Sequence, residues 1–248
     1  MKRARCMGWI ALVLSIGLTG CLGTREWQYP PLPEGRYLGI TAQQSLPATV
    51  VVLPFEDLRG REIREEYWKI TIPLVPYGVV IYDRPEEIQS PEPVDQVRFH
   101  PSIDFARALA DEVREAEIFS SVIFAHGPAI PPSDFVLRGR LYSTRWERVV
   151  TTYLLGPLGT VFWILGLPMG DTTTQVTMDL RLTPADDPSQ VLWSFAMDFE
   201  SWRLDSPYYG LEEAVQSYAM ALQDTLRPAI KDLVKKAAER IAPFQPVP

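Results

Sequence analysis

Apolar residues gather along the chain in stretches whose spacing is typical of β-strands. The stretch at residues 49–53 is continuous and β-branched, which predicts a strand buried on both faces of a sheet. In residues 172–183 apolar and polar positions alternate, which predicts a strand with one face toward a core and one toward solvent. Further strands are predicted at residues 118–124, 134–150 and 190–203.

Two other stretches have the three- and four-residue spacing of amphipathic helices. The first covers residues 102–117, with Ser102 expected at the N-cap and Asp104 in the first turn. The second covers residues 208–241, with a kink or interruption expected at Pro228. The pattern as a whole predicts an α+β (α/β) fold: a mixed, mainly antiparallel sheet of four or five strands with two packed helices, plus apolar loop insertions.

Residues 70–81 and 153–169 form these insertions, and both are apolar and broken by proline and glycine. The second carries no charge, but it is shorter than the roughly 20 residues that a helix needs to cross a bilayer. The two segments either fold back as ordinary core or form a contact surface for a partner or a lipid surface. In a plain up-and-down sheet they would leave from opposite ends and form no joint patch. The candidate contact residues are Leu74, Val75, Tyr77, Leu154, Leu155, Val161, Phe162, Trp163, Ile164 and Leu165.

The first residues of the chain have the pattern of a secretion signal. Three basic residues precede an apolar run at residues 9–18, and Leu18, Thr19, Gly20 and Cys21 follow. This pattern resembles the lipobox of bacterial lipoproteins. The resemblance implies cleavage before Cys21 and acylation of that cysteine with fatty acids such as palmitate. An ordinary signal peptide, or an uncleaved anchor that carries a cysteine, is the alternative. By the same resemblance, Leu22 rather than aspartate after the cysteine favours the outer membrane, with a lipid-anchored domain facing the periplasm.

The resemblance divides the chain into a signal peptide (1–20), an acylated cysteine with a proline-rich tether (21–48) and a single periplasmic domain (49–248). In polyproline geometry the tether would reach about 80 Å, and less if part of it docks on the domain. Its aromatic residues Trp27, Tyr29 and Tyr37 predict that part of it docks on the domain or meets lipid headgroups. Removing the signal takes the formal net charge from −7 to −10. This acidic balance argues against nucleic acid as a partner.

The sequence VVLPFEDLRG at residues 51–60 resembles the first strand and turn of the TolB amino-terminal domain and of CsgG-type envelope lipoproteins. The resemblance implies a mixed sheet with helices packed on it. No internal repeat is present that could form the TolB propeller. A CsgG-type protein would be an oligomeric secretion channel.

Few residues have the spacing that a catalytic or metal site requires. The two histidines, His100 and His126, have no paired ligands in the sequence, so no metal and no cofactor is predicted. Glu56 and Asp57 follow the first strand and are the candidates for a general acid or base if the protein is an enzyme on cell-wall or lipid substrates. A small-ligand module would instead need a pocket lined by Trp146, Trp163 or Trp193.

These observations predict a non-catalytic role. We expect an accessory or assembly component of the cell envelope that is held by acyl chains and presents its domain to an envelope protein or to further copies of itself. A CsgG-type channel, an enzyme and a ligand-binding module remain the alternatives.

Overall fold

The computed structural model describes residues 25–31, 35–88, 97–126, 130–209 and 214–241. Its longest feature is an antiparallel hairpin of β10 (Gly170–Pro184) and β11 (Trp193–Asp205), paired without a bulge from Gly170–Asp205 to Leu182–Trp193. Alternate residues of β10 are buried, among them Val176, Met178 and Leu180. The one-sided strand predicted at residues 172–183 is thereby confirmed.

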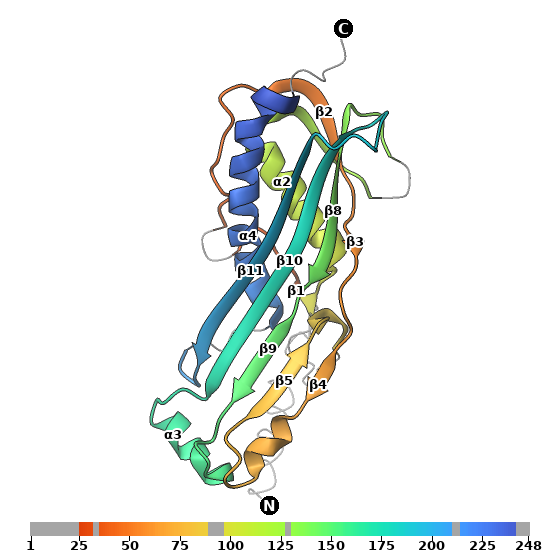
Figure 1. Cartoon of the computed structure of the whole chain (residues 1–248). Coiled ribbons are helices and arrows are strands. Elements are labelled where there is room, and N and C mark those ends of the chain that lie inside the picture. The colour runs from red at the N-terminus through yellow and green to blue at the C-terminus, as the bar shows by residue number, and fades with distance from the viewer. Residues whose placement is uncertain (1–24, 32–34, 89–96, 127–129, 210–213, 242–248) are drawn as a thin grey trace, which may run out of the picture.

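Two strands follow one another along the other edge of β10. β8 (Phe135–Ser143) pairs with its second half and β9 (Trp146–Val150) with its first half. The sequence predicted a single strand at residues 134–150, but Thr144 and Arg145 interrupt it and divide it into β8 and β9. Because of this break the sheet continues separately at its two ends (Figure 1).

At one end, β2 (Leu46–Val52) lies between β7 (Phe119–Phe124) and β8, parallel to both, and the short β3 (Glu56–Asp57) also pairs with β8. At the other end, β9 pairs with β5 (Gly78–Tyr82), which pairs with β4 (Ile63–Glu65). A 3-10 turn, η1 (Tyr67–Thr71), lies in the connection from β4 to β5. The α+β class is confirmed, but in the described part of the chain the sheet has nine strands rather than four or five.

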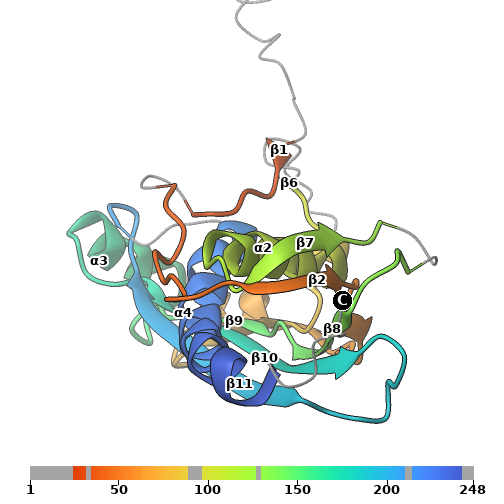
Figure 2. The same cartoon turned by 90° about the horizontal axis from the view of Figure 1, so that it is seen from above.

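Helices α2 (Pro101–Glu115) and α4 (Ala214–Lys236) cover one face of the sheet at the β2–β8 end. Seen from above, the sheet curves around them, with α2 against β7 and β2 and α4 against β10 and β11 (Figure 2). The main core lies between these layers. Its largest fully buried side chains include Phe105, Leu109, Phe135, Leu137, Leu180, Tyr218, Leu222 and Leu226. We call this part of the molecule the helical end.

Two details of the helices differ from prediction. The N-cap of α2 is His100 rather than Ser102, because Pro101 occupies the first helical position. Proline is tolerated there because an N–H at that position would have no acceptor within the helix. The His100 backbone N–H donates to Asp104 Oδ2 at 2.7 Å, so Asp104 closes the first turn as expected. α4 runs through Pro228 without interruption and ends in a π turn, η5 (Ala237–Ile241).

Part of the predicted tether lies on the domain. β1 (Arg25–Glu26) pairs with β6 (Val97–Arg98), and Trp27 packs on Phe99 with ring centroids 5.4 Å apart. Tyr29 donates a hydrogen bond to Glu112 of α2 at 2.5 Å, and the Leu38 N–H donates to the same carboxylate at 3.0 Å. The docking predicted for Trp27 and Tyr29 is confirmed.

The docked segment shortens the free part of the chain. Cys21 lies outside the described residues, but the four residue-to-residue steps from it to Arg25 can span at most about 14 Å. A lipid attached to Cys21 would therefore hold the body close to the membrane. Within the described ranges, no helix has both the length and the apolar character needed to span a bilayer.

Candidate functional site

The two apolar insertions meet at the end of the sheet farthest from the helical end (Figure 1). The start of β5 pairs with the end of β9, Gly78 opposite Val150, so the segment before β5 and the segment after β9 emerge together. The Leu74 N–H donates to the Leu154 carbonyl at 2.8 Å. We call residues 70–78 and 153–169 the apolar tip. Only a plain up-and-down sheet would send the insertions to opposite ends, and this sheet has a different strand order, in which β5 and β9 are neighbours.

The chain folds tightly within the tip. After β9 it forms a 3-10 turn, η4 (Gly156–Gly159), and then the short helix α3 (Thr160–Ile164). A Cβ atom at Gly159 would lie 1.8 Å from the Thr152 carbonyl oxygen, so only glycine fits there. Tyr153 and Leu154 both have φ in the left-handed region, 56° and 68°. The tip is thus a specific structure and not an irregular loop.

The side chains at the outside of the tip are apolar and exposed. Leu74 is 81% exposed, Leu158 74%, Leu165 69% and Ile164 68%. Of the predicted contact residues, the structure places Leu74, Tyr77, Leu154, Leu155, Val161, Ile164 and Leu165 at the surface. It half-buries Val75, Phe162 and Trp163.

The half-buried residues hold the tip together. Phe162 packs edge-on against Tyr153 with ring centroids 5.2 Å apart, and Trp163 Nε1 donates to the Thr151 carbonyl at 2.9 Å. Sequence reasoning left out Leu158 and Leu167, although both lie in the same uncharged run. It also left out Tyr208, whose hydroxyl donates to the Ile164 carbonyl at 2.7 Å. Tyr208 lies in the turn after β11, more than 40 residues from Ile164 in the sequence, so no local pattern indicates this contact.

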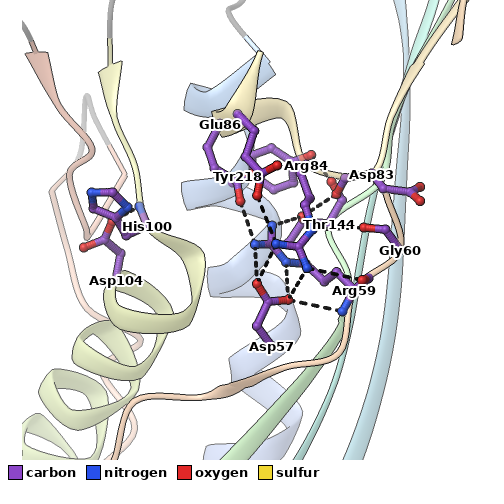
Figure 3. Close-up of polar contacts among 11 residues, drawn as sticks. Asp57, Arg59, Gly60, Asp83, Arg84, Glu86, His100, Asp104, Thr144 and Tyr218 are labelled. Atoms are coloured by element: carbon purple, nitrogen blue, oxygen red, sulfur yellow. Dashed lines mark hydrogen bonds and ion pairs between the residues drawn. The ribbon is translucent and has the colours of Figure 1, made fainter. Parts of the chain in front are cut away.

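The candidate acids of the enzyme alternative lie elsewhere, at the break between β8 and β9. There the guanidinium of Arg59 is buried between Asp57 at 2.9 Å and Glu86 at 2.6 Å (Figure 3). Arg59 also donates to Thr144 Oγ1 at 2.7 Å, and Arg84 contacts Asp57 at 3.1 Å. We call these residues the waist cluster. They tie the chain after β3 to the point where the sheet divides.

The charges of the waist cluster favour ionised carboxylates. Hydrogen bonds from Arg59 hold the pKa of Asp57 below its usual value. A general acid must carry a proton before it acts, so the lowered pKa disfavours Asp57 in that role and does not bear on a role as general base. Glu56 is exposed and lines a groove of about 280 Å³ on the outer face of β8 and β10. The groove is also lined by Arg138, Arg140, Asp179 and Arg181.

The three tryptophans of the ligand-binding alternative lie apart. Trp146 stacks on Tyr82, Trp193 Nε1 donates to Asp232 of α4 at 2.9 Å, and Trp163 belongs to the tip. None of them lines the groove on the outer face or the cavity of about 290 Å³ between Trp27 and α2. Within the part of the chain that the structure describes, no three His, Cys, Asp or Glu residues are grouped as metal ligands.

The fold is similar to several solved structures, although no family model and no curated protein matches the sequence. Protein XCC0632 from Xanthomonas campestris, of family DUF330, is 14% identical over 82% of this chain and 91% of its own, with a TM-score of 0.39. A dodecamer of a PelC variant from Paraburkholderia phytofirmans is 13% identical over 77% and 92%, with a TM-score of 0.35. A candidate lipoprotein from Caulobacter crescentus is 14% identical over 57% and 86%, with a TM-score of 0.33. Similarity at this level does not assign the chain to any of their families.

Proposed function

We propose that the protein is an acyl-anchored lipoprotein of the cell envelope with an accessory or assembly role and no catalytic step. Cys21 holds it to the outer membrane, and the domain lies in the periplasm with the apolar tip as its contact surface. The lipobox resemblance of residues 18–21 supports the anchor. Acyl chains provide stable attachment when two or more are present, and an acidic body gains little from anionic lipid.

The observation that carries the proposed role is the convergence of two separate segments on one exposed apolar end. Leu74 comes from one segment and Leu158 and Ile164 from the other, and each is more than two-thirds exposed. Isolated apolar residues are common on protein surfaces, but a contiguous group of this kind marks a site that another surface covers.

The proposal is tested by thiol protection in cells. Processing would remove Cys6 and acylate Cys21, so a cysteine introduced by Leu158→Cys would be the only free thiol. Val191→Cys is the matched control, because Val191 is apolar, 48% exposed and lies at the opposite end of the β10–β11 hairpin. We expect a water-soluble maleimide to react at least about tenfold more slowly at position 158 than at 191. Equal rates in the folded protein, with equal labelling after denaturation, would show that the tip is uncovered.

A second candidate role is the self-assembled channel, and one observation favours it. In the described residues β11 pairs only with β10, so one edge of this strand is open along residues 193–205. An open edge of this length can accept a strand from another copy. The mass of the acylated protein in mild detergent separates the two roles: a ring supports the channel, and a single copy eliminates it.

A further inference from the structure

We infer that the surface covering the apolar tip is the interfacial zone of a phospholipid bilayer, the same bilayer that holds the acyl chains of Cys21. This inference rests on the proposed function, since it names what covers the same tip. The tip would dip into the outer part of the bilayer without crossing it.

The first argument is that the polar groups of the tip are paired inside the protein. The acyl-chain region of a bilayer offers no hydrogen-bond partners, so a segment that reaches it must satisfy its polar atoms internally. Between residues 151 and 169 five side chains carry polar atoms, and each donates to a backbone carbonyl of the protein. The pairs are Thr151 to Pro76, Thr152 to Ile70, Tyr153 to Pro168, Thr160 to Pro157, and Trp163 to Thr151.

The backbone of α3 follows the same rule at its end. The N–H groups of Leu165, Gly166 and Leu167 donate to carbonyls of the preceding turn at 3.0–3.1 Å. The end of α3 therefore keeps these amides bonded inside the protein while Leu165 and Leu167 expose apolar side chains. A protein partner would not require this arrangement, because its own polar groups could complete the hydrogen bonds.

The second argument is the distribution of charge. Neither 70–78 nor 153–169 contains a charged residue, and the nearest ones in sequence are Lys69 and Asp171, on the body side of the tip. Lys69 is paired with Glu66 at 2.7 Å. Protein interfaces have a polar rim that selects the partner, whereas a bilayer interior accepts any uncharged apolar surface.

The third argument is a group of exposed aromatic residues at the edge of the tip and beside it. Rings with a polar edge are enriched at the level of lipid headgroups, where the body of the ring is in apolar surroundings and the hydroxyl or indole N–H meets water. η1 and the turn after it contribute three such residues, and the end of β11 with the turn after it contributes three more. They are Tyr67, Trp68, Tyr77, Trp202, Tyr208 and Tyr209, each at least 45% exposed.

The position of the acyl anchor determines how contact between the tip and the bilayer would orient the body. Because at most about 14 Å of chain separates Cys21 from Arg25, the acylated bilayer must lie near β1. β1 lies about midway along the body, so the long axis leans toward the membrane when the tip also touches it (Figure 1). Acyl chains alone suffice for stable attachment. The tip therefore sets the orientation of the body and adds little to its affinity for the membrane.

The inference is tested with the acylated full-length product reconstituted in vesicles of phosphatidylcholine and phosphatidylethanolamine. An environment-sensitive fluorophore is placed at Leu158→Cys, at Ile164→Cys as a second reporter, and at Val191→Cys as the control. We expect nitroxide-labelled lipid to quench at least about half of the emission at 158 and 164 and almost none at 191. A blue-shifted emission should accompany the quenching.

Absence of quenching at both tip positions would overturn the inference. If Leu158→Cys were nevertheless protected in cells, a protein or a second copy would cover the tip, and the proposed function would stand. If the thiol were also unprotected in cells, the proposed function would fail as well.

Discussion

The helical end and the apolar tip lie at opposite ends of one sheet, and both are built from apolar residues. At the helical end α2 and α4 cover the sheet, and Leu222 and Leu180 are fully buried. At the tip only η4 and the five-residue α3 follow the strands, and Leu158 remains 74% exposed. The difference indicates that the first end supplies the stability of the fold and the second supplies a surface.

The waist cluster between these two ends should show the largest effect on stability. Arg59→Ala would leave the buried carboxylate of Glu86 without its cation, whereas the more exposed Asp57 would keep its ion pair to Arg84. Breaking a buried ion pair such as Arg59–Glu86 costs about 3–5 kcal/mol. The free energy of unfolding from urea denaturation measures the loss. Arg64→Ala removes an ion pair to Glu66 from a half-exposed side chain and should lower the free energy of unfolding far less than Arg59→Ala. Similar losses for the two variants would mean that the cluster does not join the two ends.

A leucine truncation at each end compares the two regions directly. Leu222→Ala opens a cavity in a closed core and should cost about 2–5 kcal/mol. Leu158→Ala removes an exposed side chain and should change the free energy of unfolding by no more than about 0.5 kcal/mol. The same denaturation experiment measures both. A large loss at Leu158 would assign the tip to the core and contradict its role as a surface.

Charge placed on the tip should abolish the inferred contact with lipid while leaving attachment through the proposed anchor unchanged. We expect Leu158→Asp with Ile164→Asp to remove lipid quenching of a fluorophore at Leu74→Cys, because two carboxylates would have to lose their hydration. The amount of protein in the membrane fraction should not change. The control pair is Ile130→Asp with Val191→Asp, both outside the tip. Equal quenching in the two double variants would count against insertion.

A smaller effect is expected from pH. The pKa of Asp57 is lowered in the folded protein by Arg59, so its stabilising contribution is present above its unfolded pKa of about 3.9 and is lost as the pH falls through the lower folded value. Asp57→Asn should therefore be less stable than the unsubstituted protein at pH 7, and the difference should shrink below about pH 4. Urea denaturation at pH 7, 5 and 3 measures this convergence. A constant difference would mean that Asp57 is not titrating against Arg59.

The elements with strong local patterns were predictable from sequence. The continuous run of valines in β2 and the alternation in β10 depend only on neighbours along the chain, as does the spacing of α2. The break at Thr144 was not predictable, because it coincides with contacts to Arg59 and Asp83, which come from 61 to 85 residues earlier.

The candidate site shows the same limit. Its residues were recognisable as apolar segments without charge, but their union depends on the pairing of β5 with β9, which no local pattern specifies. The aromatic residues of β11 and the turn after it were missed for the same reason. Cys21 lies outside the described residues, so the anchor stays a prediction from the lipobox resemblance.

The most direct measurement is the ratio of maleimide labelling rates at Leu158→Cys and Val191→Cys in intact cells. A covered tip predicts a ratio below about 0.1, because the thiol reacts only when water and reagent reach it. A ratio near one would show that the tip is open to solvent in the cell and would contradict its role as the contact surface.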